Sequence, residues 1–248
     1  MLKTPIMNKI KLKDIKLALS INELQTLPSG KIMINTINAY SYNIAKKNKL
    51  FEEALIKSDI LLPDGVSIVM ACKWLKAKYQ PKKRITGWDL FTFEMKRLNE
   101  KGGKCLFMGS NEKVLELIKK RAKNEYPNII LETYSPPFKD NFNEEENNMM
   151  INTINQVNPD LLWIGMTAPK QESWLYSNWN KLNIHCHTGT IGAVFDFYAG
   201  TISRAPISWQ NHSLEWLFRL LKEPHRMWKR YIIGNPLFIY NIIKEKFS

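Results

Sequence analysis

A carboxylate follows a short apolar run near residue 60 and is the first candidate for chemistry. Ile60–Leu62 is an apolar run that predicts a strand, and Val66–Trp74 has apolar residues at helical spacing. Pro63-Asp64-Gly65 joins the two, and Gly65 permits an unusual backbone. A carboxylate at the carboxyl end of a strand is well placed to meet a ligand. Asp64 is therefore a candidate ligand-binding residue; the alternative is that it only caps the helix.

A second polar motif follows another apolar run, in the sequence WIGMTAPKQE from Trp163 to Glu172. We expect a strand that ends at Gly165 and a helix that Pro169 opens. The first turn would then present Lys170, Gln171 and backbone N–H donors at the edge of the sheet. Proline and glutamate are ordinary at a helix start, but a glutamine is less so. Gln171 is thus a candidate ligand-binding residue.

Two further turns contain groups that could contact a ligand. CLFMGS at 105–110 precedes a predicted helix, so Gly109 is a candidate phosphate contact. No GxGxxG follows a strand, which argues against a dinucleotide-dependent oxidoreductase. In the turn at 189–206, Asp196 either binds a ligand or braces the chain, and we prefer bracing.

Metal and disulfide chemistry are not expected. His185 and His187 would share one face of a strand, but no third ligand has a telling spacing. We expect them to be core or pocket-lining histidines, with no metal site. Cys72, Cys105 and Cys186 lie in separate apolar runs and predict buried free thiols in a reducing compartment.

Strands alternate with helices along most of the chain. The pattern predicts strands at 31–35, 60–62, 104–108, 129–134, 160–164 and 183–187, and helices at 39–47, 66–75, 111–125, 143–156, 169–180 and 191–198, the first capped by Asn38. This alternation is typical of an α/β, Rossmann-like, mostly parallel sheet covered by helices on both faces.

The pattern changes near Gly200. We expect an α/β domain at 1–200 and a helical amphipathic appendage at 201–248, with a helix at 209–221 and another from Pro224 that Gly234-Asn235-Pro236 breaks in two. Basic residues interleave with aromatic ones there, which favours a segment lying at a membrane interface. The alternative is a helix packed on its own domain or on a sister subunit.

Positive charge dominates the chain, whose formal net charge is +13. It is concentrated at 73–84, with six basic residues and no acid, and at 204–248, with eight basic and three acidic residues. Such clusters suit phosphate, nucleic acid or an anionic membrane surface.

The charged N-terminus through Lys13 predicts no secretory signal, and no run approaches the ~18 apolar residues of a spanning helix. We therefore expect a cytoplasmic protein that rests on a membrane.

Six segments together resemble the WecG/TagA/CpsF family of glycosyltransferases. They occur in the family's order and cover the chain from about residue 36 to 236. The matching segments are LLPDG at 61–65, RxxGxDLF at 84–91, APKQE at 168–172, GxxGAxFDF at 189–197, RAP at 204–206 and EWLxRLxxEPxRxWKRY at 215–231.

The resemblance implies a bacterial enzyme of surface-polysaccharide synthesis. Members transfer a sugar from a UDP-sugar to an undecaprenyl-diphosphate-linked sugar, with inversion and without a metal or other cofactor. The appendage would close the active site at the inner face of the cell membrane, and its apolar surface predicts self-association away from membranes. The donor stays open among N-acetylmannosamine, its uronic acid, glucose and glucuronic acid.

The resemblance also implies roles for individual residues. Asp64 matches the proposed general base and Thr36 an active-site threonine. The positions that match substrate-binding residues are Asn38, Arg84, Gln171, Arg219 and Arg226. Lys229 matches a third basic position of the appendage, and Arg230 is next to it. A lysine at 229 offers a point charge in place of a guanidinium fork. The guanidinium groups would stabilise the leaving diphosphate.

A different class of protein remains as an alternative, namely a basic α/β nucleic-acid- or nucleotide-binding protein without transferase activity. The net charge fits that class equally well. The aromatic residues, however, cluster with leucine and isoleucine and do not form a stacking platform. We therefore expect no nucleic-acid partner.

Overall fold

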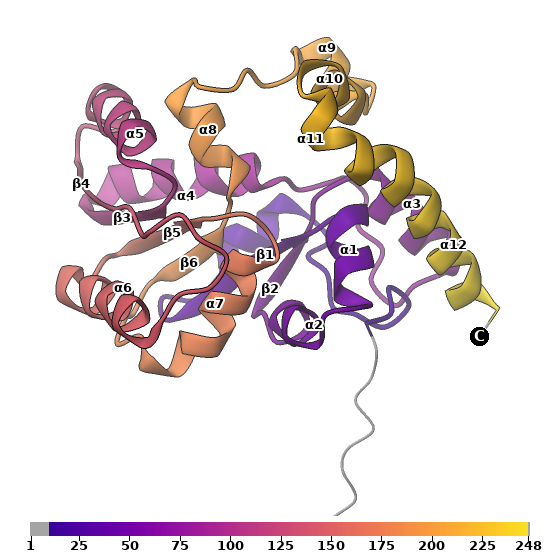
Figure 1. Ribbon diagram of the computed structural model, residues 1–248, viewed down its shortest axis with the longest axis horizontal. Coiled ribbons are helices and arrows are strands. Elements are labelled where there is room, and N and C mark those ends of the chain that lie inside the picture. The colour runs from indigo at the N-terminus through magenta and orange to yellow at the C-terminus, as the bar shows by residue number, and fades with distance from the viewer. Residues whose placement is uncertain (1–9, 248) are drawn as a thin grey trace, which may run out of the picture.

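The computed structural model describes residues 10–247, and its centre is a parallel sheet (Figure 1). Within these residues the sheet has six strands in the order β2-β1-β6-β5-β3-β4. They are β1 (Ile32–Ile37), β2 (Ile60–Pro63), β3 (Gly103–Gly109), β4 (Ile129–Tyr134), β5 (Leu161–Gly165) and β6 (His187–Thr190). All pairs are parallel, which confirms the predicted α/β class. The expectation about a secretory signal falls partly on residues 1–9, outside the described part.

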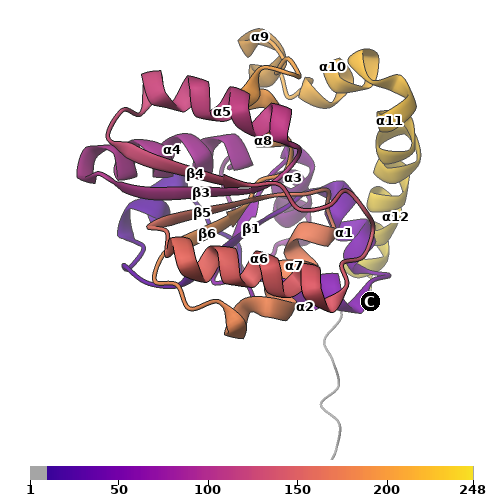
Figure 2. The same cartoon turned by 60° about the vertical axis from the view of Figure 1, so that its left-hand side comes forward.

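Helices cover both faces of the sheet, as Figure 2 shows. Side chains of a strand alternate between faces, so Cys105 and Phe107 pack with the helices at 87–101, 112–125 and 193–199, while Leu106 and Met108 pack with those at 144–157 and 170–178. The helices up to residue 199 are α1 (Ala39–Ala45), α2 (Lys49–Ile56), α3 (Val66–Leu75), α4 (Gly87–Lys101), α5 (Glu112–Glu125), α6 (Glu144–Val157), α7 (Lys170–Asn178) and α8 (Ala193–Ala199), with short 3-10 turns at Ile21–Thr26 and Trp179–Lys181.

The strand predicted at 183–187 is wrong in its position. Leu182, Ile184 and Cys186 are buried and alternate with exposed residues, which imitates a strand, but pairing with the sheet begins only at His187. His185 is consequently exposed outside the strand, and His187 is buried. The two therefore do not share one face of a strand. His187 is the core histidine expected, because its ring contacts Glu94, Arg97 and the Pro28 carbonyl.

The helices after Gly200 differ from the prediction in two places. The helix expected at 209–221 is divided into α9 (Ile207–Asn211) and α10 (Glu215–Lys222), because Ser213 has a φ of +60°. The expected break at Gly234 is absent from the described chain, since α11 (Pro224–Trp228), a π-helical turn (Lys229–Ile233) and α12 (Gly234–Lys246) are continuous. Pro236 lies in α12 just after the π-helical turn, whose hydrogen bonds run from i to i+5 in place of the regular i to i+4.

The long C-terminal helix packs along α1 and α3 at the β2 edge of the molecule (Figure 1). Tyr42 and Phe238 meet edge to face at 5.5 Å, and the Asn43 side chain donates to the Gly234 carbonyl at 2.7 Å. Tyr42 also donates to the buried carboxylate of Glu245. Of the described helices, none has the length and hydropathy needed to cross a bilayer. The division of the chain at residue 200 stays a prediction.

Candidate active site

A large cleft opens where β1, β2, β5 and β6 end. Loops after these strands form one side, and helices α10 to α12 form the other. The cleft has a volume of about 2230 Å³. A site for one small molecule usually has about 300–1,000 Å³. The cleft therefore has room for more than one substrate at the carboxyl edge of the sheet, where open α/β sheets bind ligands.

Asp64 lies in this cleft directly after β2. Its backbone N–H donates to the Ile37 carbonyl at 2.8 Å, which joins the ends of β1 and β2. Gly65, at a φ of +144°, is the residue that precedes α3, and α3 has no side-chain cap. The alternative in which Asp64 only caps the helix is therefore wrong. Within residues 10–247 its carboxylate makes no hydrogen bond or ion pair, so it is available to a ligand.

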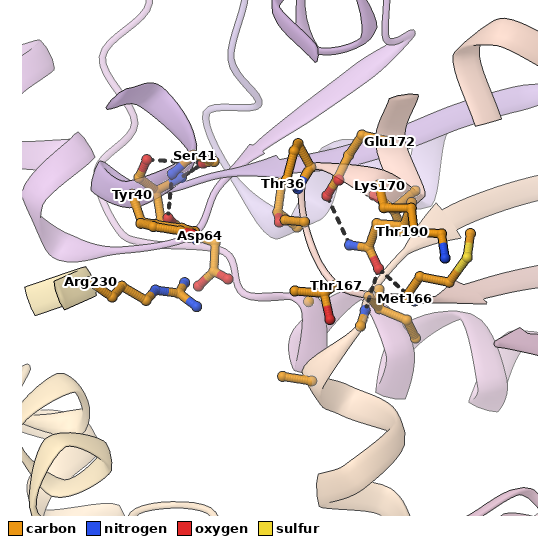
Figure 3. A pocket seen from close by; sticks show the side chains of 18 of the residues that line it. Thr36, Tyr40, Ser41, Asp64, Met166, Thr167, Lys170, Glu172, Thr190 and Arg230 are labelled. Atoms are coloured by element: carbon orange, nitrogen blue, oxygen red, sulfur yellow. Dashed lines mark hydrogen bonds between the residues drawn. The ribbon is translucent and has the colours of Figure 1, made fainter. Parts of the chain in front are cut away.

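Charged groups around Asp64 tune its acidity. Burial raises the pKa of the carboxyl to about 6, with help from the Glu215 carboxylate, while Arg230 and Arg84 oppose the rise. The Arg230 side chain extends toward Asp64 from the opposite wall (Figure 3). A base works best when its pKa lies near the operating pH. Asp64 is thus ionised at neutral pH and still basic enough to accept a proton.

Thr36 and Asn38 come from β1 and the turn after it, and both line the cleft. Asn38 caps α1 as predicted: its Oδ1 accepts from the Ser41 N–H at 3.0 Å, and Ser41 Oγ accepts from the Asn38 N–H at 2.7 Å. This reciprocal cap fixes the turn beside Asp64.

Gln171 is buried and connects two loops of the cleft. Its Oε1 accepts from the Met166 N–H at 3.0 Å and from the Gly192 N–H at 3.1 Å, and its Nε2 donates to Glu172 at 2.8 Å. Glu172 is buried as well, and burial raises its pKa to about 7. Thr36 lies beside Glu172 in Figure 3. The amide oxygen of Gln171 thus holds the loops at Met166 and Gly192 together, and its amide nitrogen holds Glu172.

Arg84 reaches the cleft from the loop before α4. Thr86 and Asp89 form a capping box at the start of that helix and hold the loop. The Arg84 guanidinium pairs with Glu215 on α10 at 2.9 Å, and Arg204 approaches the other oxygen of Glu215 at 3.5 Å. These two arginines and one carboxylate together carry one net positive charge.

The basic residues of the last helices also line the cleft: Arg219, Arg226, Lys229 and Arg230. Arg219 lies over the Phe197 ring, Arg230 lies over Tyr40, and Arg226 pairs with Glu223 at 2.8 Å. Among the described residues, nothing accepts a hydrogen bond from the buried Nε of Arg219 or of Arg230. Buried donors without partners are costly, and an anion bound between them would satisfy both.

Two other predicted residues lie outside or at the rim of this arrangement. Gly109 is absent from the described cleft lining, which includes the next residues, Ser110 and Asn111. A Cβ at Gly109 would come within 2.2 Å of the Gly165 carbonyl, so glycine lets β3 and β5 end side by side. Asp196 lines the cleft and braces its turn, since it accepts from the Thr201 hydroxyl at 3.4 Å.

Sequence reasoning missed Glu215, Arg204 and Glu172 as parts of the site. All three belong to the motifs at 168–172, 204–206 and 215–231. The motifs therefore contained these residues, but nothing in the sequence indicated what each of them does. The three cysteines are buried free thiols, as predicted. Among residues 10–247, no group of three or more His, Cys, Asp or Glu side chains could hold a metal ion.

Comparison with known proteins identifies the family of the chain. The model of the glycosyl transferase WecG/TagA/CpsF family matches residues 6–248. The chain is 28% identical to the N-acetylglucosaminyldiphosphoundecaprenol N-acetyl-beta-D-mannosaminyltransferase of Bacillus subtilis (strain 168), over 86% of this chain and 80% of that protein. It is 27% identical to the enzymes of the same name from Bacillus spizizenii, over 99% and 93%, and from Staphylococcus aureus (strain MW2), over 88% and 82%. The chain therefore belongs to the WecG/TagA/CpsF family of glycosyltransferases.

Proposed function

We propose that this enzyme transfers a sugar from a UDP-sugar to an undecaprenyl-diphosphate-linked N-acetylglucosamine, with inversion at the anomeric carbon. The names of the relatives support N-acetylmannosamine as the sugar and the lipid-linked acceptor. The product would feed a bacterial cell-surface polysaccharide. The partners are accordingly a nucleotide-sugar, a lipid diphosphate and the inner face of the cell membrane.

The observation behind this proposal is an unpaired carboxylate opposite a wall of guanidinium groups. Asp64 would accept the proton of the acceptor hydroxyl as that oxygen attacks the anomeric carbon and the bond from sugar to UDP breaks. The departing diphosphate gains negative charge. Arg219 and Arg230, whose buried Nε donors lack partners among the described residues, would stabilise that charge together with Arg226 and Lys229.

These guanidinium groups also support a reaction that does not depend on a metal, because they supply the positive charge that a divalent cation would otherwise provide. Thr36, Asn38, Arg84 and Gln171 would position the two substrates from the strand ends. Residues 201–248 would act as the appendage that closes the cleft at the membrane. The exposed Trp228, Ile232 and Tyr240 on its outer surface support that location.

A UDP-release assay tests the proposal. Purified protein is given a synthetic lipid-diphosphate-linked N-acetylglucosamine and a panel of UDP-sugars in the presence of EDTA. We expect acceptor-dependent UDP release with one donor, and a loss of roughly 100-fold or more in Asp64→Asn, the range of a general base. Undiminished release in Asp64→Asn would remove Asp64 from this role, and release abolished by EDTA would refute metal independence. Salt-sensitive binding of nucleic acid without any release would favour the alternative class.

A further inference from the structure

An apolar groove leads away from Asp64 between α3 and α12. Val66, Met70 and Trp74 follow one another at four-residue spacing and form an exposed stripe on α3. Ile239 and Ile243 form a second exposed stripe on α12. All five side chains border the same cleft as Asp64. The groove is therefore continuous with the site of the proposed chemistry.

The two stripes lie along the seam between their helices. α3 and α12 are in contact along the β2 edge (Figure 1). Lys246 donates to the Trp74 carbonyl at 2.8 Å, and Ile242 is buried in the core cluster that includes Ile68 and Cys72 of α3. Ile239 and Ile243 flank Ile242 and Lys246 on the helical surface, and so they lie on the flank of α12 that borders α3.

The head of this groove is charged, and the side chains along it are apolar as far as Trp74, where the Lys246 ammonium lies 5.5 Å from the centre of the ring. Val66 is two residues after Asp64, and Arg230 faces Asp64 from the start of the same C-terminal helix. From Val66 to Trp74 the groove follows α3 for about 12 Å, at 1.5 Å per residue. A molecule with a charged group at one end and a hydrocarbon chain at the other would fit this groove, and the proposed lipid-diphosphate acceptor has that form. Such a chain would cover apolar surface that the protein leaves in water.

We propose that the groove between α3 and α12 binds the first isoprene units of the acceptor's polyprenyl chain. This inference rests on the proposed function and adds to it a lipid subsite within the protein. The outward-facing residues of the appendage would rest on the bilayer, while the groove guides the chain from the bilayer to Asp64. Chain length would then affect catalysis even where no membrane is present.

The test compares two soluble acceptors with the same diphospho-N-acetylglucosamine head, one with a farnesyl chain and one with a dimethylallyl chain. Both are assayed without detergent or vesicles, below the concentration at which they aggregate. For the wild type, we expect kcat/KM to be about tenfold higher with farnesyl, as burial of a few methylene groups would give. In Met70→Gln/Ile239→Gln that preference is lost, while turnover of the dimethylallyl acceptor is retained.

Ile233→Gln is the matched control. Ile233 is 53% exposed and Ile239 58%, both belong to the C-terminal helix, and Ile233 does not border the described cleft. This variant keeps the farnesyl preference.

Equal kcat/KM for the two acceptors in the wild type would overturn the proposal that the groove binds the lipid chain. A preference for farnesyl retained by the double variant would overturn it as well. Turnover of neither acceptor by the wild type, with vesicles absent and then added, would overturn the proposed function itself. If the double variant instead abolishes self-association in sedimentation and leaves the preference intact, the groove is an interface between copies of the chain.

Discussion

The guanidinium of Arg84 and the carboxylate of Glu215 form a 2.9 Å ion pair between residues 131 positions apart in the chain. Arg84 belongs to the loop before α4, and Glu215 begins α10. The pair is mostly buried, with side-chain exposures of 23% and 15%, so water screens it less than a surface pair. It joins the two walls of the cleft and places one more carboxylate near Asp64.

Replacing Glu215 with glutamine should move the acid limb of the pH–rate profile to lower pH. The Glu215 carboxylate raises the pKa of Asp64, which is about 6, and Arg84 lowers it. Without the Glu215 charge, the Asp64 pKa falls, and this proposed base stays ionised at more acidic pH. The measurement is kcat/KM for the dimethylallyl acceptor against pH. Glu116→Gln, which alters an exposed carboxylate on α5, should leave the profile in place. An unmoved acid limb in Glu215→Gln would contradict the coupling.

Replacing Arg230 with glutamine should move the same limb in the opposite direction. Arg230 lowers the pKa of Asp64, so its loss leaves Asp64 protonated up to a higher pH. The leaving diphosphate would also lose a donor, for which we expect kcat to fall roughly 100-fold. The assay is the same pH series, with Lys222→Gln, an exposed charge change on α10, as the control. A fall in kcat with no upward movement of the limb would mean that Arg230 does not interact with Asp64.

The strands and their ligand-binding edge could be predicted from the sequence because the signals are local. The apolar runs of β3 and β5 end at Gly109 and Gly165, and the cap of α1 at Asn38 follows from its residue type. The prediction did not include helix α4, although Thr86 and Asp89 at its start have capping-box spacing.

The interactions across the cleft could not be predicted, because they depend on tertiary placement. No short sequence pattern predicts that Arg84 pairs with Glu215 or that Arg230 faces Asp64. The same holds for Gln171: its residue type marked it as unusual, but only the fold shows that it accepts from Met166. The helix at Gly234 continues for a similar reason. A π-helical turn precedes it, and packing against Asn43 holds it in place.

Replacing Gln171 with alanine should destabilise the fold and slow catalysis. The half-buried Met166 and Gly192 N–H groups would lose their acceptor, and an unmet donor costs at most about 1–3 kcal/mol. We expect a lower urea midpoint and a lower kcat, with a smaller change in KM for the donor, because the residue positions the loops. Gln156→Ala on the exposed face of α6 is the matched control. A higher KM with unchanged stability would instead identify Gln171 as a direct substrate contact.

Replacing Glu172 with glutamine should stabilise the protein at alkaline pH. Burial raises the Glu172 pKa from 4.5 to about 7, so the folded state holds a proton that the unfolded state releases. Between these values the wild type therefore loses stability as pH rises, by at most about 3 kcal/mol. Glutamine keeps an oxygen for the Gln171 amide and has no charge to bury. The gain of the variant over the wild type should be small at pH 5 and largest at pH 8. Urea unfolding at both pH values measures this difference in the free energy of unfolding. The titration of Asp64 contributes equally to both proteins and does not affect the difference. Glu100→Gln, an exposed carboxylate on α4, should show no such gain, and an equal gain at both pH values would contradict the buried, protonated Glu172.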